Sequence, residues 1–211
     1  MVKMLEAMLG GTLVSLEVFV LTLIIALPLA LPVALGRMSK NSFIRGPTSL
    51  YVLVMRGTPL ILQLIFVYFA PYYIFKTSYD RFTAVIIAFS INYAAYFAEI
   101  YRGGIESISP GQWEAAKVLG FTRSQTFFRI ILPQVIKRIL PSTANEVITL
   151  VKDTALAQTI GVAELFRVAQ NASARQFSTM PIFIAGAFYF IMNWAVSAAF
   201  EKAERKLSYY K

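Results

Sequence analysis

Residues 10–36 read GGTLVSLEVFVLTLIIALPLALPVALG, and this stretch decides the class of protein. Its only charged residue is Glu17. A helix that crosses a bilayer needs about 20 predominantly apolar residues, and this stretch exceeds that length. It is too long for a secretory signal, and it ends in Gly36-Arg37 rather than at a small-residue cleavage site. The sequence therefore predicts an integral membrane protein.

The composition of the whole chain agrees with a membrane protein. Of its 211 residues, 57% are hydrophobic and 15% are charged, whereas soluble domains are roughly 45–50% apolar and about 25% charged. There is no Cys and no His, which excludes disulfides and iron–sulfur clusters and removes the commonest general base and most zinc and haem sites. A chain of this length is expected to form a single domain, residues 1–211.

Four further apolar stretches complete a prediction of five membrane spans. The five are expected at roughly 10–36, 48–73, 83–101, 140–166 and 181–200. The fourth stretch is the most polar, since it contains Asn145, Glu146, Lys152 and Asp153. The predicted fold class is thus an all-α polytopic membrane protein with five transmembrane helices.

The loop charges predict the orientation. The net charge is +9, and the basic residues gather in the first and third loops and in the C-terminal tail. The other side carries only Lys3, Lys76, Arg81, Arg167 and Arg175, partly offset by Glu6 and Asp80. Cytoplasmic loops carry the excess of Lys and Arg in membrane proteins. The N-terminus is therefore expected outside and the C-terminus in the cytoplasm.

The third loop, residues 102–138, is far longer than a usual helix connection. Ser109-Pro110 is typical of a helix start and Gly120 of a helix end. A second amphipathic stretch, 123–131, is expected to end before Pro133. Such a structured cytoplasmic loop is either a docking surface or gate, or a helix that lies on the membrane.

The same loop carries a spaced motif, which consists of Glu114-Ala115-Ala116, Gly120, Ile130 and Leu132-Pro133. The motif resembles the EAA loop of bacterial ABC importer permeases. Other segments resemble the polar amino acid subfamily of these permeases, the histidine, glutamine and arginine type; they are Arg56-Gly57-Thr58-Pro59, the run AEIYRGGI at 98–105, and Val151-Lys152-Asp153-Thr154. The resemblance covers nearly the whole chain, from about Thr12 to Glu201.

The resemblance implies the permease subunit of an ATP-driven amino acid importer in the bacterial cytoplasmic membrane. It implies a homodimer or heterodimer of permeases, docked on two cytoplasmic ATPase subunits that bind ATP and Mg, and an extracytoplasmic binding protein that delivers the substrate. The chain itself is expected to be no enzyme and to hold no cofactor or metal. The sequence agrees, because it has no Gly-x-x-x-x-Gly-Lys-Ser/Thr phosphate loop.

Five residues of the loop are the candidates for docking the ATPase, with the helix that bears the motif as the coupling helix. Glu114 offers a carboxylate to basic or amide groups, and Ala115 and Ala116 remove bulk so that a partner can approach. Gly120 permits a sharp turn. Phe121 is an apolar candidate for an interface anchor.

Ionisable groups inside a span cost roughly 2.5–3.5 kcal/mol each at the bilayer centre and are therefore candidates for function. Glu146 and Asp153 are seven residues apart, so they share one helix face with Thr149 between them. That face must point into the protein or a watery cavity. These two acids are the leading candidates for substrate binding, and their surplus of negative charge favours arginine, lysine or histidine. Glutamine or another neutral polar amino acid is the alternative.

Three other polar residues are weaker substrate-binding candidates. Gly57 and Pro59 interrupt the second span, and a broken span often lines a binding site, which makes Thr58 a candidate. Asn92 is a neutral polar group within the third span. Glu99 either pairs locally with Arg102 or lines a substrate path.

An intramembrane enzyme and a passive channel are the two other classes of protein open to a polytopic chain. An intramembrane enzyme has few mechanisms without His, and the chain has no Gly-x-Ser-x-Gly elbow. A passive channel has no use for a long structured cytoplasmic loop with a docking helix. Both alternatives explain less of the sequence than an importer subunit does.

Overall fold

The computed structural model describes residues 2–207, and within that range the chain is helical with no strand. The elements in order are α1 (Val2–Arg37), α2 (Ser42–Gly57), α3 (Leu60–Phe75), α4 (Arg81–Glu106), α5 (Pro110–Val118), α6 (Arg123–Gln125), the π-helical turn η1 (Thr126–Ile131), α7 (Leu132–Asp153), the 3₁₀ segment η2 (Thr154–Ile160), α8 (Leu165–Gln176) and α9 (Met180–Leu207).

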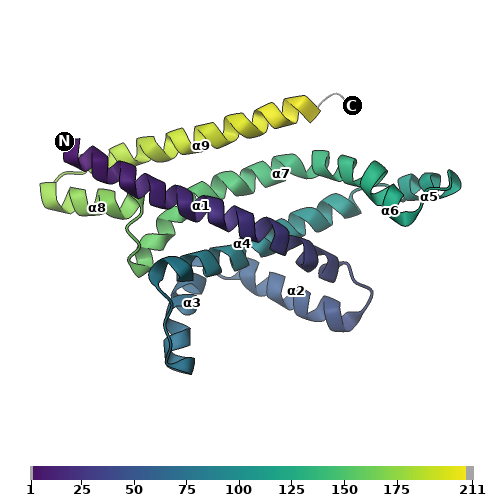
Figure 1. Ribbon diagram of the computed structural model, residues 1–211, viewed down its shortest axis with the longest axis horizontal. Coiled ribbons are helices and arrows are strands. Elements are labelled where there is room, and N and C mark those ends of the chain that lie inside the picture. The colour runs from purple at the N-terminus through teal and green to yellow at the C-terminus, as the bar shows by residue number, and fades with distance from the viewer. Residues whose placement is uncertain (1, 208–211) are drawn as a thin grey trace.

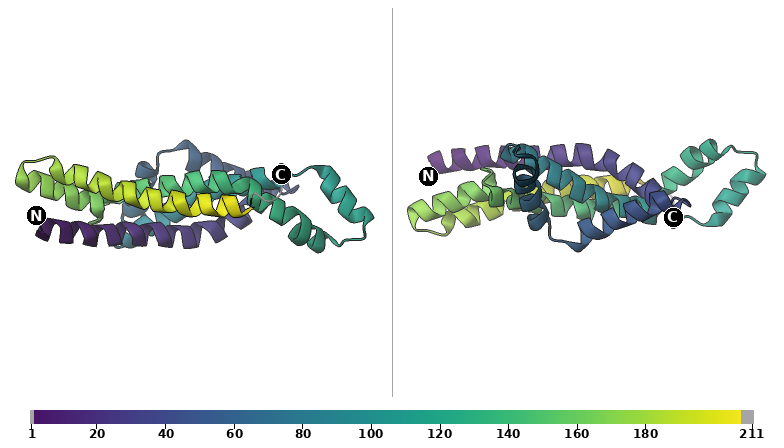
Figure 2. Two further views of the ribbon diagram at one scale, coloured as in Figure 1. Left: turned by 90° about the horizontal axis from the view of Figure 1, so that it is seen from above. Right: turned by 90° about the horizontal axis from the view of Figure 1, so that it is seen from below.

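The molecule is elongated along the direction of its long helices (Figure 1). Helices α5 and α6 form a protrusion at one end, and α8 lies with the start of α1 at the other end. Figure 2 shows α9 running along the body from the α8 end towards the α5 end. Helix α3 projects sideways from the body, at a steep angle to the other long helices.

Helix α4 is the centre of the packing. It packs against α1, α2, α3 and α7, and 61% of its most apolar stretch is buried, against 6% for α9. The α1 face that packs on it carries small residues one helical turn apart, at Ala26, Ala30 and Ala34. Such small residues let two helix backbones approach closely, which is how helices associate in a membrane.

The helix lengths confirm a membrane protein with several spans. Three described helices, α1, α4 and α9, are long and apolar enough to cross a bilayer, and α2 with α3 gives a fourth span if the bent pair is counted as one. Helix α7 is not apolar enough to be counted with them, because its sequence is rich in charged residues. The described residues 2–207 therefore show three or four candidate spans, and the predicted count of five stays a prediction.

The second predicted span, 48–73, is two helices rather than one. Helices α2 and α3 meet at an angle of 111°. Thr58 and Pro59 at the junction are both extended, with ψ of 147° and 135°. Proline disfavours the helical conformation in the residue before it, so Thr58 leaves the helix and α2 ends at Gly57. The predicted interruption is confirmed, and it is a sharp corner.

The fourth predicted span, 140–166, is wrong as a single helix. Helix α7 begins earlier and ends at Asp153, and η2 continues it to Ile160. Gly161 then adopts a left-handed conformation with φ of 85°, which ends the segment. Glu164 begins α8 as its N-cap. Hydropathy does not register a turn made by a glycine.

The third loop contains the predicted short helix. Ser109 caps α5 through its side chain, Pro110 is the first helical residue, and Gly120 is left-handed with φ of 77°. The second stretch does not end before Pro133, because the helix passes through η1 into α7 without a break. Proline lacks a backbone donor, and a π-helical turn shifts the hydrogen-bond ladder, so a proline at this junction is tolerated.

Glu164 joins three helices at the α8 end of the molecule, and its side chain is fully buried. Its carboxylate accepts hydrogen bonds from the backbone N–H of Phe166 and Arg167, both at 2.7 Å, and from the Tyr189 hydroxyl at 2.9 Å. Ser15 of α1 accepts from the N–H of Leu165 at 3.3 Å. A buried carboxylate is stable when such donors surround it.

Replacing Glu164 with alanine should therefore destabilise the protein. The change removes a helix cap and takes from the half-buried Tyr189 hydroxyl its carboxylate acceptor, which together cost about 2–4 kcal/mol. The apparent melting temperature of the purified protein in detergent should fall by several degrees. Glu6→Ala, at an exposed position of α1, is the matched control. Equal melting temperatures for the two variants would show that Glu164 does not hold the three helices together.

Candidate functional site

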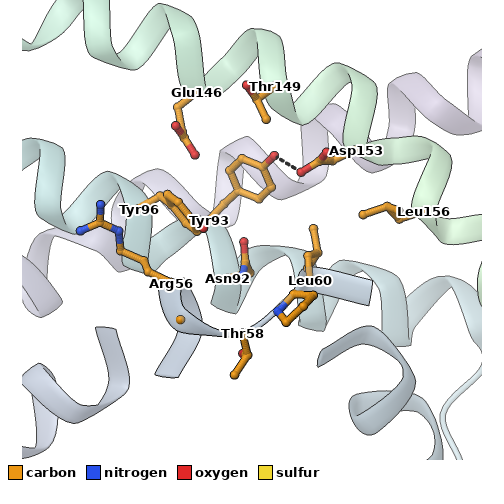
Figure 3. Close-up of a pocket in the computed structure, with 12 residues that line it drawn as sticks. Arg56, Thr58, Leu60, Asn92, Tyr93, Tyr96, Glu146, Thr149, Asp153 and Leu156 are labelled. Carbon is orange, nitrogen blue, oxygen red and sulfur yellow. Dashed lines mark hydrogen bonds between the residues drawn. The ribbon is translucent and has the colours of Figure 1, made fainter. Parts of the chain in front are cut away.

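A cavity of about 490 Å³ opens where α2, α3, α4 and α7 meet. Figure 3 shows the acids on α7 facing the α2–α3 corner across the aromatic residues of α4. Five of the six predicted substrate-binding residues line this cavity: Thr58, Asn92, Glu146, Thr149 and Asp153. The structure therefore brings together residues that lie almost 100 positions apart in the sequence.

The α7 wall of the cavity consists of Glu146, Thr149 and Asp153 on one helix face. Glu146 forms no hydrogen bond and no ion pair with the described residues 2–207. Asp153 accepts a hydrogen bond of 2.8 Å from the Tyr93 hydroxyl. Thr149 donates to the Asn145 carbonyl of its own helix at 3.0 Å. Glu146 is thus the acid of this wall that is left without a partner.

The opposite wall is the α2–α3 corner, and two amides hold it in place. The Gln63 side chain donates to the Met55 carbonyl at 2.9 Å and to the Thr58 hydroxyl at 2.8 Å. Asn92 of α4 donates to the Met55 carbonyl at 3.1 Å and to the Gln63 side-chain oxygen at 2.9 Å. Asn92 lines the cavity as predicted, but its N–H groups are committed to bracing the corner.

Sequence reasoning missed the aromatic floor of the cavity. Tyr93 and Tyr96 of α4 lie between the two walls, with their rings 6.3 Å apart. Tyr93 is almost fully buried, and its hydroxyl reaches Asp153. The sequence contains a signal for both residues, because each is within one turn of the polar Asn92 on the same helix.

Arg56 is the one basic residue that lines the cavity. Its guanidinium lies over the Tyr96 ring, 5.4 Å from the centroid, and 3.7 Å from Glu99. The formal charges of the cavity residues are therefore two negative and one positive. Lys152, a conceivable partner for the acids, is exposed and is not among the residues that line the cavity.

Glu99 lies outside the cavity, so the structure does not support it as a substrate ligand. Its carboxylate is bound by Arg37 at 2.9 Å and by Arg102 at 2.8 Å, with Arg56 further away. Arg37 also donates to Ser49. The cluster joins α1, α2 and α4, which agrees with the ion-pair alternative for this residue.

The five predicted docking residues lie together at α5 but differ in exposure. Glu114, Ala115 and Gly120 are exposed. Ala116 is only 1% exposed, so it packs inside the loop and cannot meet a partner as expected. Phe121 is half-buried. The most exposed apolar side chains of this segment are Val118 and Leu119, at 87% and 73%, which the sequence analysis did not name.

Residues 23–209 match the family described as "Binding-protein-dependent transport system inner membrane component". The chain is 42% identical over 203 residues to the L-cystine transport system permease protein TcyB of Bacillus subtilis (strain 168), covering 95% of this chain and 86% of the relative. It is 37% identical over 198 residues to the putative glutamine transport system permease protein GlnP of Rickettsia felis, covering 93% and 91%. It is 36% identical to the octopine transport system permease protein OccM of Rhizobium radiobacter, covering 94% and 84%.

Solved structures agree with the sequence relatives. The crystal structure of an amino acid ABC transporter with histidines superposes with a TM-score of 0.90 at 37% identity and covers 98% of this chain and 96% of that one. The inward-facing MetNI methionine ABC transporter has a TM-score of 0.76 at 18% identity, covering 97% and 96%, which shows the shared fold.

The family match, the relatives and the superposition lead to one conclusion. The chain belongs to the binding-protein-dependent inner membrane components, that is, the permease subunits of ABC transporters, in the group that contains amino acid permeases.

Proposed function

We propose that this permease carries amino acids with a cationic side chain, such as arginine, lysine or histidine, and that Glu146 and Asp153 bind the cationic group. The observation that supports this is the unpaired carboxylate of Glu146, which faces a cavity together with a second acid on the same helix face. A half-buried carboxylate without a partner is costly, and a cationic ligand removes that cost.

The other end of an amino acid finds opposite charge in the same cavity. Arg56 and the first turn of α3 at Leu60 both line it. No side chain caps the start of α3, and the free N–H groups of a helix N-terminus favour an anionic group. We expect the substrate α-carboxylate to lie at this wall and the cationic side chain at the α7 wall.

The similar solved transporter was crystallised with histidines, an amino acid whose side chain can carry a positive charge, which agrees with this proposal. A neutral polar amino acid is the second candidate, because relatives of this chain are named as L-cystine and glutamine permeases. In that case Glu146 and Asp153 bind the substrate α-ammonium group rather than its side chain.

The proposed topology has five spans: α1, the bent pair α2–α3, α4, α7 with η2, and α9. The N-terminus and α8 lie outside, and the α5 protrusion lies in the cytoplasm of a bacterial cell. Membrane subunits of this family do not themselves catalyse a reaction. We expect a second permease subunit and two ATPase subunits, which hold ATP and Mg, and an extracytoplasmic binding protein.

We expect α5 to be the coupling helix, with an exposed face formed by Glu114, Ala115, Val118 and Leu119. Gly120 ends this helix with a turn in which its N–H donates to the Lys117 carbonyl and the N–H of Phe121 donates to the Ala116 carbonyl. With this turn, α5 protrudes from the body as a short, compact helix that can fit into a cleft on an ATPase subunit.

The first prediction of the proposal concerns substrate charge. Glu146→Gln and Asp153→Asn keep the size of each side chain and remove its charge. At least one of them should reduce arginine uptake about 10-fold or more, since a ligand cation left unpaired costs about 1–3 kcal/mol. The measurement is uptake of labelled arginine and glutamine into vesicles that contain the full complex.

The control for this experiment is Glu6→Gln, an exposed acid far from the cavity, which should transport normally. Arginine uptake at the wild-type rate by both cavity variants would show that these two acids do not bind the substrate cation. Wild-type transport of glutamine or cystine with rejection of arginine would favour the neutral candidate.

The second prediction concerns coupling. Gly120→Trp places a bulky side chain at the left-handed turn that ends the proposed docking helix. The permease should still insert, but ATP hydrolysis should no longer drive uptake, so that transport falls about 10-fold or more while each subunit stays folded.

Gly120→Asn is the matched control, because asparagine tolerates the left-handed conformation better than other residues with a side chain. It should stay coupled. Normal assembly and transport by Gly120→Trp would show that α5 is not the docking helix.

A further inference from the structure

A second polar cavity, of about 440 Å³, lies at the far end of η2 from the first. Arg81 at the start of α4 and Arg167 in the first turn of α8 both line it, and both side chains are exposed. Tyr68, Gln158 and Thr159 add neutral hydrogen-bonding groups. The two cavities share no lining residue. The second is therefore a separate site, connected to the first through η2 and α3.

Neither arginine of this cavity forms an ion pair within the described part of the chain. Asp80 precedes Arg81, but its carboxylate caps α4 by accepting from the Thr83 N–H at 3.0 Å. Hydrogen bonding to Thr83 also lowers the pKa of Asp80. Glu164 is fully buried and is bound to backbone N–H groups and Tyr189. The Arg167 guanidinium thus keeps its donors for an external acceptor, and the Arg81 guanidinium keeps all but the one that reaches the Gly161 carbonyl.

The Arg81 guanidinium lies against Gly161. The Arg81 Nη1 donates to the Gly161 carbonyl at 3.4 Å. A Cβ at position 161 would lie 2.9 Å from Nη1, and the φ of 85° also disfavours any residue other than glycine. The glycine therefore leaves space for this arginine over the turn that ends η2.

The proposed topology puts this cavity on the extracytoplasmic side. Membrane proteins carry few basic residues on that side, and two of those that this chain is expected to carry there, Arg81 and Arg167, line the same cavity. Two guanidinium groups bind a carboxylate through directed, charge-assisted hydrogen bonds. A free amino acid would bring an ammonium group as well, and no acid lines this cavity to receive it.

We infer that Arg81 and Arg167 form a docking site for an aspartate or glutamate side chain on the extracytoplasmic binding protein. This inference rests on the proposed function and on its orientation. The docked carboxylate contacts the start of α4 and the turn after η2. The other end of η2 lies at the first cavity, which Leu156 lines. Docking and substrate release thereby act on the same segment.

The test uses the complete transporter in nanodiscs with its binding protein. ATP hydrolysis is measured against binding-protein concentration for the wild type and for the double variant Arg81→Gln, Arg167→Gln. The concentration for half-maximal stimulation should rise about 10-fold, because removing charge at an interface weakens encounter. Its dependence on ionic strength should flatten.

Two variants act as controls. Lys76→Gln removes an exposed charge from the same side, outside the cavity, and should leave stimulation unchanged. The double variant Arg81→Lys, Arg167→Lys keeps both charges and should retain most of the stimulation. A double Gln variant that matches the wild type, or a Lys76→Gln defect of equal size, overturns the docking site.

Binding of labelled amino acid to the transporter without binding protein distinguishes the two possible sources of the carboxylate. A loss of this binding in the double Gln variant, with unchanged stimulation, would mean that the cavity takes the substrate itself, which contradicts the inference. Labelling of cysteines placed at Ser78 and Ser42 with an impermeant thiol reagent checks the orientation. Uptake of amino acids by the wild-type transporter tests the proposed function by itself. A failure of the proposed function can therefore be told apart from a failure of the docking site.

Discussion

A corner in a helix that crosses a membrane frees backbone groups that hydrocarbon cannot satisfy, so the protein must supply their partners. In this permease the corner between α2 and α3 at Thr58–Pro59 meets that constraint through the side chains of Gln63 and Asn92. These bonds tie the corner to α4, which is also the central helix of the packing. The position of the cavity depends on this bracing, because the corner forms one of its walls.

The same arrangement explains why acids can stay in the cavity. Helix α7 turns Glu146 and Asp153 towards the corner rather than towards lipid, and Tyr93 supplies a hydroxyl to only one of them. The cavity therefore combines a negative wall with the uncapped start of α3 and with Arg56. Opposite charges at the two ends of the cavity suit a zwitterionic ligand such as an amino acid. The second acid of the α7 wall suits a ligand that carries one more positive charge.

The sequence predicted the membrane class and the helical fold from the length of its apolar runs. It predicted the broken span from Pro59 and the short helix α5 from Ser109-Pro110 and Gly120, because each of these residues acts on the backbone next to it. It also placed Glu146, Thr149 and Asp153 on one helix face, because a seven-residue spacing fixes that face, whereas only the structure brings Thr58 and Asn92 to the same cavity. It could not predict the bracing of Met55 by Asn92 or the burial of Ala116, which depend on contacts between distant segments. Residues 140–166 failed as one span, since hydropathy does not register the left-handed Gly161.

A structure of the complete transporter with bound arginine, determined by electron microscopy in a lipid nanodisc, tests the central claim most directly. The account predicts ligand density in the cavity between α7 and the α2–α3 corner, with the guanidinium at Glu146 or Asp153 and the carboxylate near the start of α3. Arginine density at another place in the permease, with this cavity empty, would contradict it.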